Sequence, residues 1–173
     1  MDSSLLHSNC GAYEILYWDA KSGKQLRSTR DSVESDALWN DWTCVLGFPV
    51  MGIWEMGGDG TDVNSVHRSS DGRFVATADD RGKIKLFNYP CIAKDSPSRS
   101  YSGHSSHVAN VRFSAGDKWL VSCGGLDKGV FCWRVHRRPP SSHRGEQRQG
   151  DYSLLQGSPS RKKGLKPEGA WIA

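Results

Sequence analysis

Residues 61–89 read TDVNSVHRSSDGRFVATADDRGKIKLFNY, and residues 106–135 read SHVANVRFSAGDKWLVSCGGLDKGVFCWRV. Both stretches place short apolar runs between turn signals in the same order, at a spacing of about 45 residues. The apolar runs have the length and the residue types of β-strands, and no segment keeps a helical period. A self-similar unit of this length is typical of the blades of a β-propeller.

More strand candidates precede the two copies. Residues 11–19, GAYEILYWD, are predicted to close an earlier blade, because the run ends in an aromatic residue, an aspartate and a turn. Residues 43–48 and 50–54 are two further candidates, joined across Pro49. A closed propeller needs four or more blades, which 173 residues do not provide. We therefore predict an all-β fold, a partial WD-repeat-type β-propeller of about three blades of four-stranded antiparallel sheet in residues 1–135. The chain is expected to begin inside a blade, as a short form or a piece of a longer protein.

Charge is distributed unevenly along the chain. Residues 1–135 hold 15 Lys or Arg against 16 Asp or Glu, a net of −1, whereas residues 136–173 hold 8 against 3, a net of +5. The second part is rich in Pro, Gly, Ser and basic residues without a periodic apolar face, which predicts a disordered basic tail. Arg161, Lys162 and Lys163 are its densest cluster and suit either plain solvation or attraction to an acidic partner.

Several classes of function find no support in the sequence. The five cysteines are odd in number and lack C-x-x-C spacing, which favours reduced thiols in an intracellular protein. No apolar run reaches the length of a membrane span, and no signal-peptide pattern opens the chain. P-loop, G-x-S-x-G and dinucleotide fingerprints are absent, so we predict no enzyme activity, no cofactor and no small-molecule substrate.

Five uncommon strings, taken together, resemble the C-terminal propeller region of the echinoderm microtubule-associated-protein-like family. They follow one collinear order within about residues 5–135: GAYEILYWD at 11–19, WTCVLGFPVMGIW at 42–54, DGTDVNSV at 59–66, ADDRGKIKLFNYPC at 78–91 and GHSSHVANVRF at 103–113. The resemblance implies a WD-repeat propeller that binds tubulin or microtubules in the cytoplasm, at the cytoskeleton. The family's coiled coil has no heptad counterpart here, so attachment through a coiled coil is not implied.

WD repeats often tie their strands together through a buried hydrogen-bond network of a His, a Ser or Thr, a turn Asp and a final Trp. Cys123 stands at the expected hydroxyl position of the second copy, so we expect a partial network there. A structural role is predicted for the candidates, because buried polar groups must be paired: His104, Asp127 and Trp133 in the second copy, and Asp80 and Thr77 in the first.

A zinc site is an alternative use of His104, together with His107 and Cys123, because imidazole and thiolate are good zinc ligands. No fourth ligand is apparent near them in the pattern. We therefore predict no bound metal.

Three tryptophans, Trp39, Trp42 and Trp54, flank the irregular segment between the first strand and the repeats. They either pack into the blade core or form an apolar patch that contacts a partner. The predicted function is that of a non-enzymatic protein-interaction module, with tubulin or microtubules as partner by resemblance and nucleic acid as a less expected one. The alternative is a general WD-repeat scaffold or regulatory fragment that pairs through open sheet edges with other propeller-containing proteins.

Overall fold

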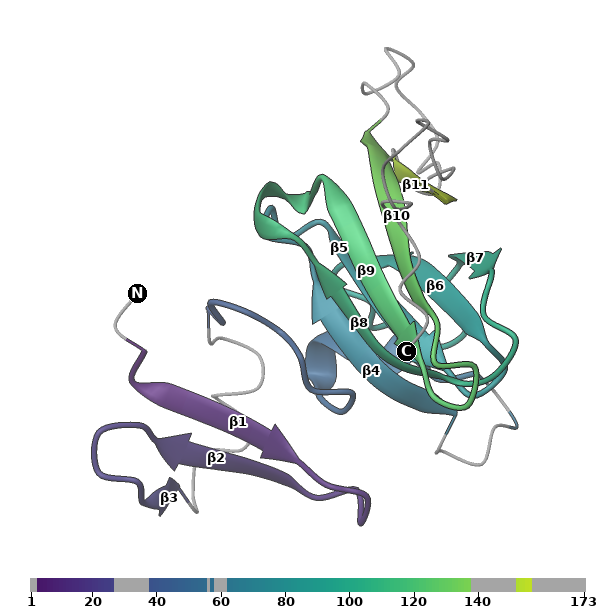
Figure 1. Ribbon diagram of the computed structural model, residues 1–173. Helices are drawn as coiled ribbons and strands as arrows, with labels where there is room; N and C mark the ends of the chain where they lie inside the picture. The colour runs from purple at the N-terminus through teal and green to yellow at the C-terminus, as the bar shows by residue number, and fades with distance from the viewer. Residues whose placement is uncertain (1–2, 27–37, 56, 58–61, 138–151, 157–173) are drawn as a thin grey trace.

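The computed structural model describes residues 3–26, 38–55, 57, 62–137 and 152–156, which Figure 1 draws as coloured ribbon. Their regular structure is nearly all β-strand, in three antiparallel sheets. The first sheet has the order β1-β2-β3, with bounds Leu5–Asn9, Ile15–Asp19 and Gln25–Leu26. The second has the order β4-β5-β6-β7, with bounds Val63–Arg68, Phe74–Asp79, Lys83–Asn88 and Ser98–Ser102. The third has the order β8-β9-β10-β11, with bounds Val108–Phe113, Trp119–Gly124, Val130–Arg137 and Tyr152–Gln156. The prediction of an all-β chain of about three blades is confirmed.

The two sequence copies form the first three strands of the two four-stranded sheets, β4–β6 and β8–β10. Their first strands show the same irregularity, since the register shifts between Val63 and Ser65 in β4 and between Val108 and Asn110 in β8. A turn links the first two strands of the first copy and a short 3₁₀ helix, η2 (Ala115–Asp117), those of the second; in them Gly72 and Gly116 have φ angles of 69° and 71°. Only glycine takes this left-handed conformation without a steric cost, so these turns set the register of each hairpin.

The segment from residue 43 to residue 54 differs from the prediction, because it forms no strand. It contains instead a 3₁₀ helix, η1, over Phe48–Ile53. Non-local contacts satisfy the backbone here: Gly52 N–H donates to Cys91 O over 2.7 Å, and Cys91 N–H donates to Pro49 O over 2.7 Å. Apolar residues on both sides of Pro49 therefore mark a tightly packed connection between blades.

The predicted tail differs from the structure in one part. Strand β10 extends to Arg137, and β11, Tyr152–Gln156, pairs with it antiparallel from Trp133 opposite Gln156 to Arg137 opposite Tyr152. The prediction rested on the composition of the whole C-terminal part, which does not reveal a strand of five residues. Such a strand can pair with an open sheet edge without a large core of its own. The remainder of the predicted tail lies outside the described residues.

Two buried clusters hold the sheets together. The first lies between the two four-stranded sheets: Ala76, Ala78, Ile84, Leu86, Val108, Val111, Phe113, Leu120 and Trp133. The second joins η1 and its flanking segments to the second sheet: Trp42, Val50, Ile53, Val66, Val75, Phe87 and Cys91. In the described part of the chain no helix is long and apolar enough to cross a bilayer.

Candidate functional site

The clearest polar cluster is the predicted network of the third sheet. His104 Nδ1 lies 2.9 Å from Asp127 Oδ2, and His104 Nε2 lies 2.8 Å from Ser122 Oγ. The indole N–H of Trp133 donates to the same Ser122 oxygen over 2.9 Å. A neutral imidazole that carries its proton on Nδ1 satisfies every group, because Ser122 then donates to Nε2 and accepts from Trp133. The network is therefore complete.

The hydroxyl of this network belongs to Ser122, whereas the sequence pattern predicts Cys123 at that position. Ser122 is 1% exposed, and the next side chain along β9, Cys123, is half-buried. Successive side chains of a strand point to opposite faces, so a difference of one position decides which of the two residues meets His104.

Ser122, His104 and Asp127 have the arrangement of a nucleophile, a base and an orienting carboxylate. The His104 side chain, however, is fully buried, and the Ser122 oxygen also accepts from Trp133. Neither of the two cavities described below is lined by these residues. These hydrogen bonds tie the turn of Asp127 to β9 and β10.

The second sheet uses a different aspartate from the one predicted. Thr77 is buried, as its place in β5 requires, but the carboxylate that closes the β5–β6 turn is Asp79. It accepts from Arg81 N–H over 3.0 Å and from Lys83 N–H over 2.7 Å. Asp80 lies at the exposed end of the turn and accepts from the Asn64 amide over 2.7 Å. Turn closure thus needs the buried aspartate, and Asp80 helps to link β4 to the turn.

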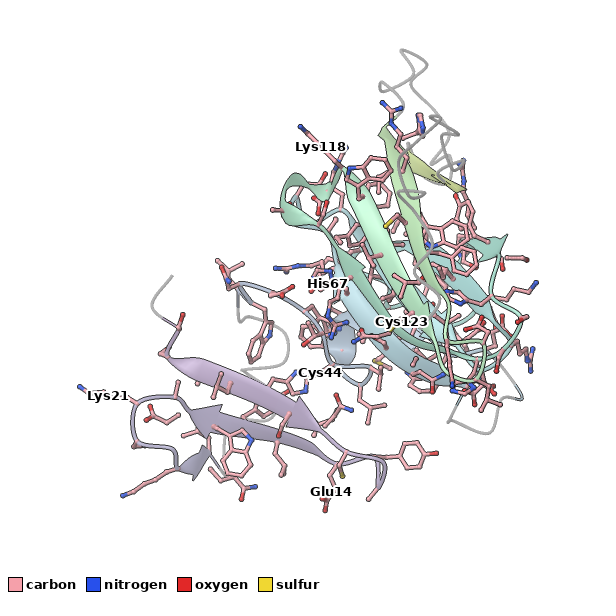
Figure 2. All side chains as sticks on the ribbon, in the orientation of Figure 1. Glu14, Lys21, Cys44, His67, Lys118 and Cys123 are labelled. Carbon is pink, nitrogen blue, oxygen red and sulfur yellow. The ribbon has the colours of Figure 1, made fainter. Side chains whose placement is uncertain are left out.

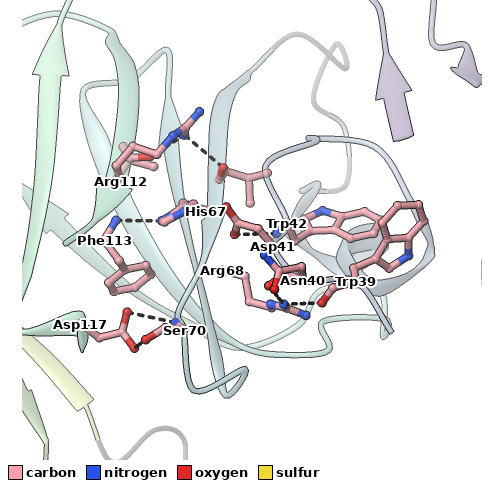
Figure 3. Close-up of polar contacts among 12 residues, drawn as sticks. Trp39, Asn40, Asp41, Trp42, His67, Arg68, Ser70, Arg112, Phe113 and Asp117 are labelled. Atoms are coloured by element: carbon pink, nitrogen blue, oxygen red, sulfur yellow. Dashed lines mark hydrogen bonds and ion pairs between the residues drawn. The ribbon is translucent and has the colours of Figure 1, made fainter. Parts of the chain in front are cut away.

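The seam between the second and third sheets is made by polar groups of their first strands and the following turns (Figure 3). Ser65 Oγ donates to Asn110 Oδ1 over 2.8 Å, and Phe113 N–H donates to His67 Nδ1 over 2.8 Å. The buried Asp117 carboxylate accepts from the Ser70 backbone N–H over 3.0 Å. These pairs lie 45 to 47 residues apart in the chain, which is the repeat spacing itself. Equivalent positions of adjacent blades therefore contact one another.

His67 is a proton-sensitive part of this seam and lies between the sheets in Figure 2. Its Nδ1 accepts from Phe113 N–H, so that nitrogen must be unprotonated, while Nε2 lies 3.4 Å from Asp41 Oδ2. Burial lowers the pKa of His67 below its ordinary value of 6.5, and nearby Arg112 adds to this, although Asp41 opposes it.

Acidification from pH 7.5 to pH 5.5 is expected to lower the Tm of the chain, and to do so less in the His67→Gln variant. The unfolded chain takes up a proton on this imidazole near pH 6.5, whereas the folded chain does so only at lower pH. The unfolded state then binds more protons, so stability falls as the pH drops below about 6.5. Thermal unfolding at several pH values measures the change of Tm with pH in both proteins. An equal change in the unaltered chain and in the variant would contradict the role of His67.

The three tryptophans lie around the first sheet and η1. Trp42 is 3% exposed, and its ring centroid lies 5.9 Å from that of Trp39 and 5.0 Å from that of His7. Trp54 is half-buried and donates its indole N–H to Val45 O over 3.1 Å. Trp42 is therefore part of the core, and any contact of this group with a partner would have to use Trp39 or Trp54.

Two cavities open near these tryptophans. One, of about 270 Å³, lies beside Trp54 and holds a charged cluster in which Lys85 Nζ lies 2.6 Å from Glu55 Oε1 and 3.4 Å from Asp79 Oδ2. The hydrogen bond from Lys85 lowers the pKa of Glu55, so this carboxylate stays ionised. The other, of about 760 Å³, runs beside β1 and is lined by residues 3–7 and 38–44.

The remaining sequence candidates are placed as follows. Within the described residues, no group of three or more His, Cys, Asp or Glu side chains could hold a metal ion, so His104, His107 and Cys123 do not form a zinc site there. All five cysteines are free thiols. The basic cluster of Arg161, Lys162 and Lys163 lies outside the described residues.

Comparison with known proteins assigns most of the chain. Residues 1–135 match the family model described as "Echinoderm microtubule-associated protein second beta-propeller". "Echinoderm microtubule-associated protein-like 3" of Mus musculus is 53% identical over 135 residues, which are 78% of this chain and 15% of that protein. "Echinoderm microtubule-associated protein-like 2" of Homo sapiens is 52% identical over 134 residues, or 78% of this chain and 20% of that protein.

The match ends near residue 135, so β11 and the basic cluster lie beyond it. The chain spans about 15–20% of the length of these curated relatives. It therefore corresponds to part of one propeller of much longer proteins. On the strength of the matched residues, the chain belongs to the echinoderm microtubule-associated protein family, within its second β-propeller.

Proposed function

We propose that this chain is a non-enzymatic protein-interaction module that binds tubulin or microtubules at the cytoskeleton, in the cytoplasm. The observation that carries the proposal is the match of residues 1–135 to the second propeller of a microtubule-associated protein family. Relatives about 50% identical over this stretch carry the words "microtubule-associated" in their names.

The chemistry of the described side chains supports binding over catalysis. The Ser122, His104 and Asp127 groups are used in holding strands together, and the charged groups beside Trp54 neutralise one another. The basic residues after residue 135 suit the acidic tails of tubulin, which attract Lys and Arg through long-range electrostatics.

The purified full chain is expected to co-migrate with purified tubulin at low salt. Reversing the charge of the basic cluster, with Arg161, Lys162 and Lys163 each changed to Glu, should weaken binding about tenfold. This follows from roughly 0.5 kcal/mol for each exposed ion pair that is lost. Binding should also weaken as salt screens the charges. Anisotropy titration with labelled tubulin, repeated over a salt series, measures both effects.

A matched control changes net charge by the same amount elsewhere, with Lys21, Lys24 and Lys118 each changed to Glu. These lysines are exposed, in the connections that precede β3 and β9. They should matter less than the basic cluster if the C-terminal part attracts tubulin. Failure of the unaltered chain to co-migrate with tubulin at low salt would reject the proposal.

A further inference from the structure

The tetrapeptide Ser-Pro-Ser-Arg occurs twice in the chain, at residues 96–99 and at residues 158–161. A serine followed by proline, with an arginine three positions on, is a substrate pattern of proline-directed protein kinases. Proline has no backbone N–H, so it can enter an apolar pocket of a kinase without burying an unpaired donor. The arginine suits an acidic site, and such charge patterns help kinases to select their substrates. The first copy, unlike the second, lies within the described residues, so its surroundings can be examined.

The connection that holds Ser96 is open to solvent. It runs over residues 89–97, between β6 and β7. Residues 92–95 and Pro97 are exposed, and Ser96 is half-buried. Strand β7, which follows, stands at the end of the strand order of its sheet and pairs with β6. An exposed connection and an end strand open locally at a lower cost in free energy than the core of a sheet. A kinase can therefore reach residues 96–99 while the rest of the sheet stays folded.

The Ser96 hydroxyl lies where this connection contacts η1. It donates a hydrogen bond to Ala93 O, and a Cβ added to Gly52 of η1 would lie only 2.5 Å from Ser96 Oγ. The same connection holds η1 in place, because Gly52 N–H donates to Cys91 O over 2.7 Å and Cys91 N–H donates to Pro49 O over 2.7 Å. The space beside Ser96 Oγ on the side of η1 is thus already filled by backbone.

A phosphoryl group on Ser96 would disturb this contact in two ways. It replaces the hydroxyl proton, so Ser96 could no longer donate to Ala93 O. It also carries about two negative charges at neutral pH, which the Ala93 carbonyl oxygen and the adjacent Asp95 carboxylate would repel. The exposed Lys94 ammonium would attract the same charges toward solvent. All three effects draw residue 96 away from η1.

We propose that Ser96 is phosphorylated by a proline-directed protein kinase, and that the phosphoryl group loosens the attachment of η1 to the second sheet. In the transfer, Ser96 Oγ attacks the γ-phosphorus of ATP and forms a new O–P bond. The bond from the γ-phosphorus to the oxygen that bridges it to the β-phosphorus breaks, and ADP leaves with that electron pair. The hydroxyl proton passes to the catalytic aspartate of the kinase. This proposal does not rest on tubulin binding, and its test uses no tubulin.

The first experiment incubates the purified full chain with a kinase of the cyclin-dependent class, ATP and Mg²⁺, and locates phosphate by tandem mass spectrometry. We expect phosphate on Ser96 and also on Ser158, whose tetrapeptide is identical and which serves as the internal reference. Pro97→Ala should slow the modification of Ser96 at least about tenfold, because it removes ring methylenes from the kinase pocket and adds an N–H there. Ser98→Ala, the matched change at the next position, should leave the rate unaltered. Phosphate on Ser158 without phosphate on Ser96, or equal rates in the Pro97 and Ser98 variants, would overturn the proposal.

The second experiment follows the contact with η1 by amide hydrogen exchange at residue resolution. It compares phosphorylated and unmodified protein in the Ser158→Ala background, where Ser96 is the modified serine. The amides of Gly52 and Cys91 should exchange at least about tenfold faster after phosphorylation, while those of β8 and β9 stay unchanged. Ser96→Ala loses the hydroxyl without gaining charge and should raise their exchange less than the phosphoryl group does. Unchanged exchange at Gly52 and Cys91, or an equal increase in β8 and β9, would overturn the coupling to η1.

Discussion

Replacing Leu120 with alanine is expected to lower the free energy of unfolding by about 2–5 kcal/mol, the cost of a cavity in a core that cannot close around it. Leu120 is fully buried within the cluster between the two four-stranded sheets. It pairs with Phe113 on β8 and with Trp133 on β10, so its side chain is held by neighbours on both sides. Small domains are stable by only about 5–15 kcal/mol, and the loss is therefore a large share of the total.

Thermal unfolding of the full chain, followed by far-ultraviolet circular dichroism, measures this effect. At about 2–4 °C for each kcal/mol in a chain of this length, the Tm should fall by roughly 4–20 °C. Leu126→Ala removes the same atoms at an 82% exposed site and should change the Tm by little. Similar losses in both variants would mean that the two sheets do not form a common core in solution.

Ser122→Ala is expected to destabilise the chain by about 2–6 kcal/mol, although it removes a single oxygen. That oxygen serves two buried partners, His104 Nε2 and Trp133 Nε1, and each buried polar group left without a partner costs about 1–3 kcal/mol. Cys123→Ala, at the next position of the same strand, should cost much less, because Cys123 lies outside the network.

A double-mutant cycle separates the network from simple packing. Ser122→Ala and Trp133→Phe are made singly and together, and unfolding by urea gives three free-energy differences. If Ser122 and Trp133 act as one unit, the double variant should lose less stability than the sum of the single losses. A strictly additive result, or a larger effect of Cys123→Ala than of Ser122→Ala, would refute the hydrogen-bond assignment.

The strands of the two repeats could be predicted because their signals are local. A run such as Phe74-Val75-Ala76 between two turns predicts a strand from its own residue types. The turns at Gly72 and Gly116 depend only on the conformation of those glycines. The packing of Trp42 into the core was one of two alternatives for the tryptophans, since apolar surface alone does not say whether protein or partner covers it.

The hydrogen-bond partners of the site were harder to predict. To predict that Ser122 and not Cys123 bonds to His104, or that Asp79 and not Asp80 closes its turn, one must know which face of the strand points inward. The local sequence does not say which of two adjacent side chains faces that way. The register of β8, the strand next to β9, shifts between Val108 and Asn110. No pattern in the sequence predicts this shift. A one-residue error in facing exchanges the buried and exposed sets entirely.

The sequence alone determined the family, the repeat of about 45 residues, the strand content and the basic character of the C-terminal part, because each is carried by neighbouring residues or by composition. Tertiary structure alone decided the Ser122 network, the 3₁₀ helix at Phe48–Ile53, the pairing of Tyr152–Gln156 with β10 and the cavity beside β1. Each of these depends on groups far apart in the chain, such as Gly52 and Cys91, that meet only once the blades have packed. A polar group finds its hydrogen-bond partner only when the chain folds. The identity of that partner therefore follows from the fold and not from the local sequence.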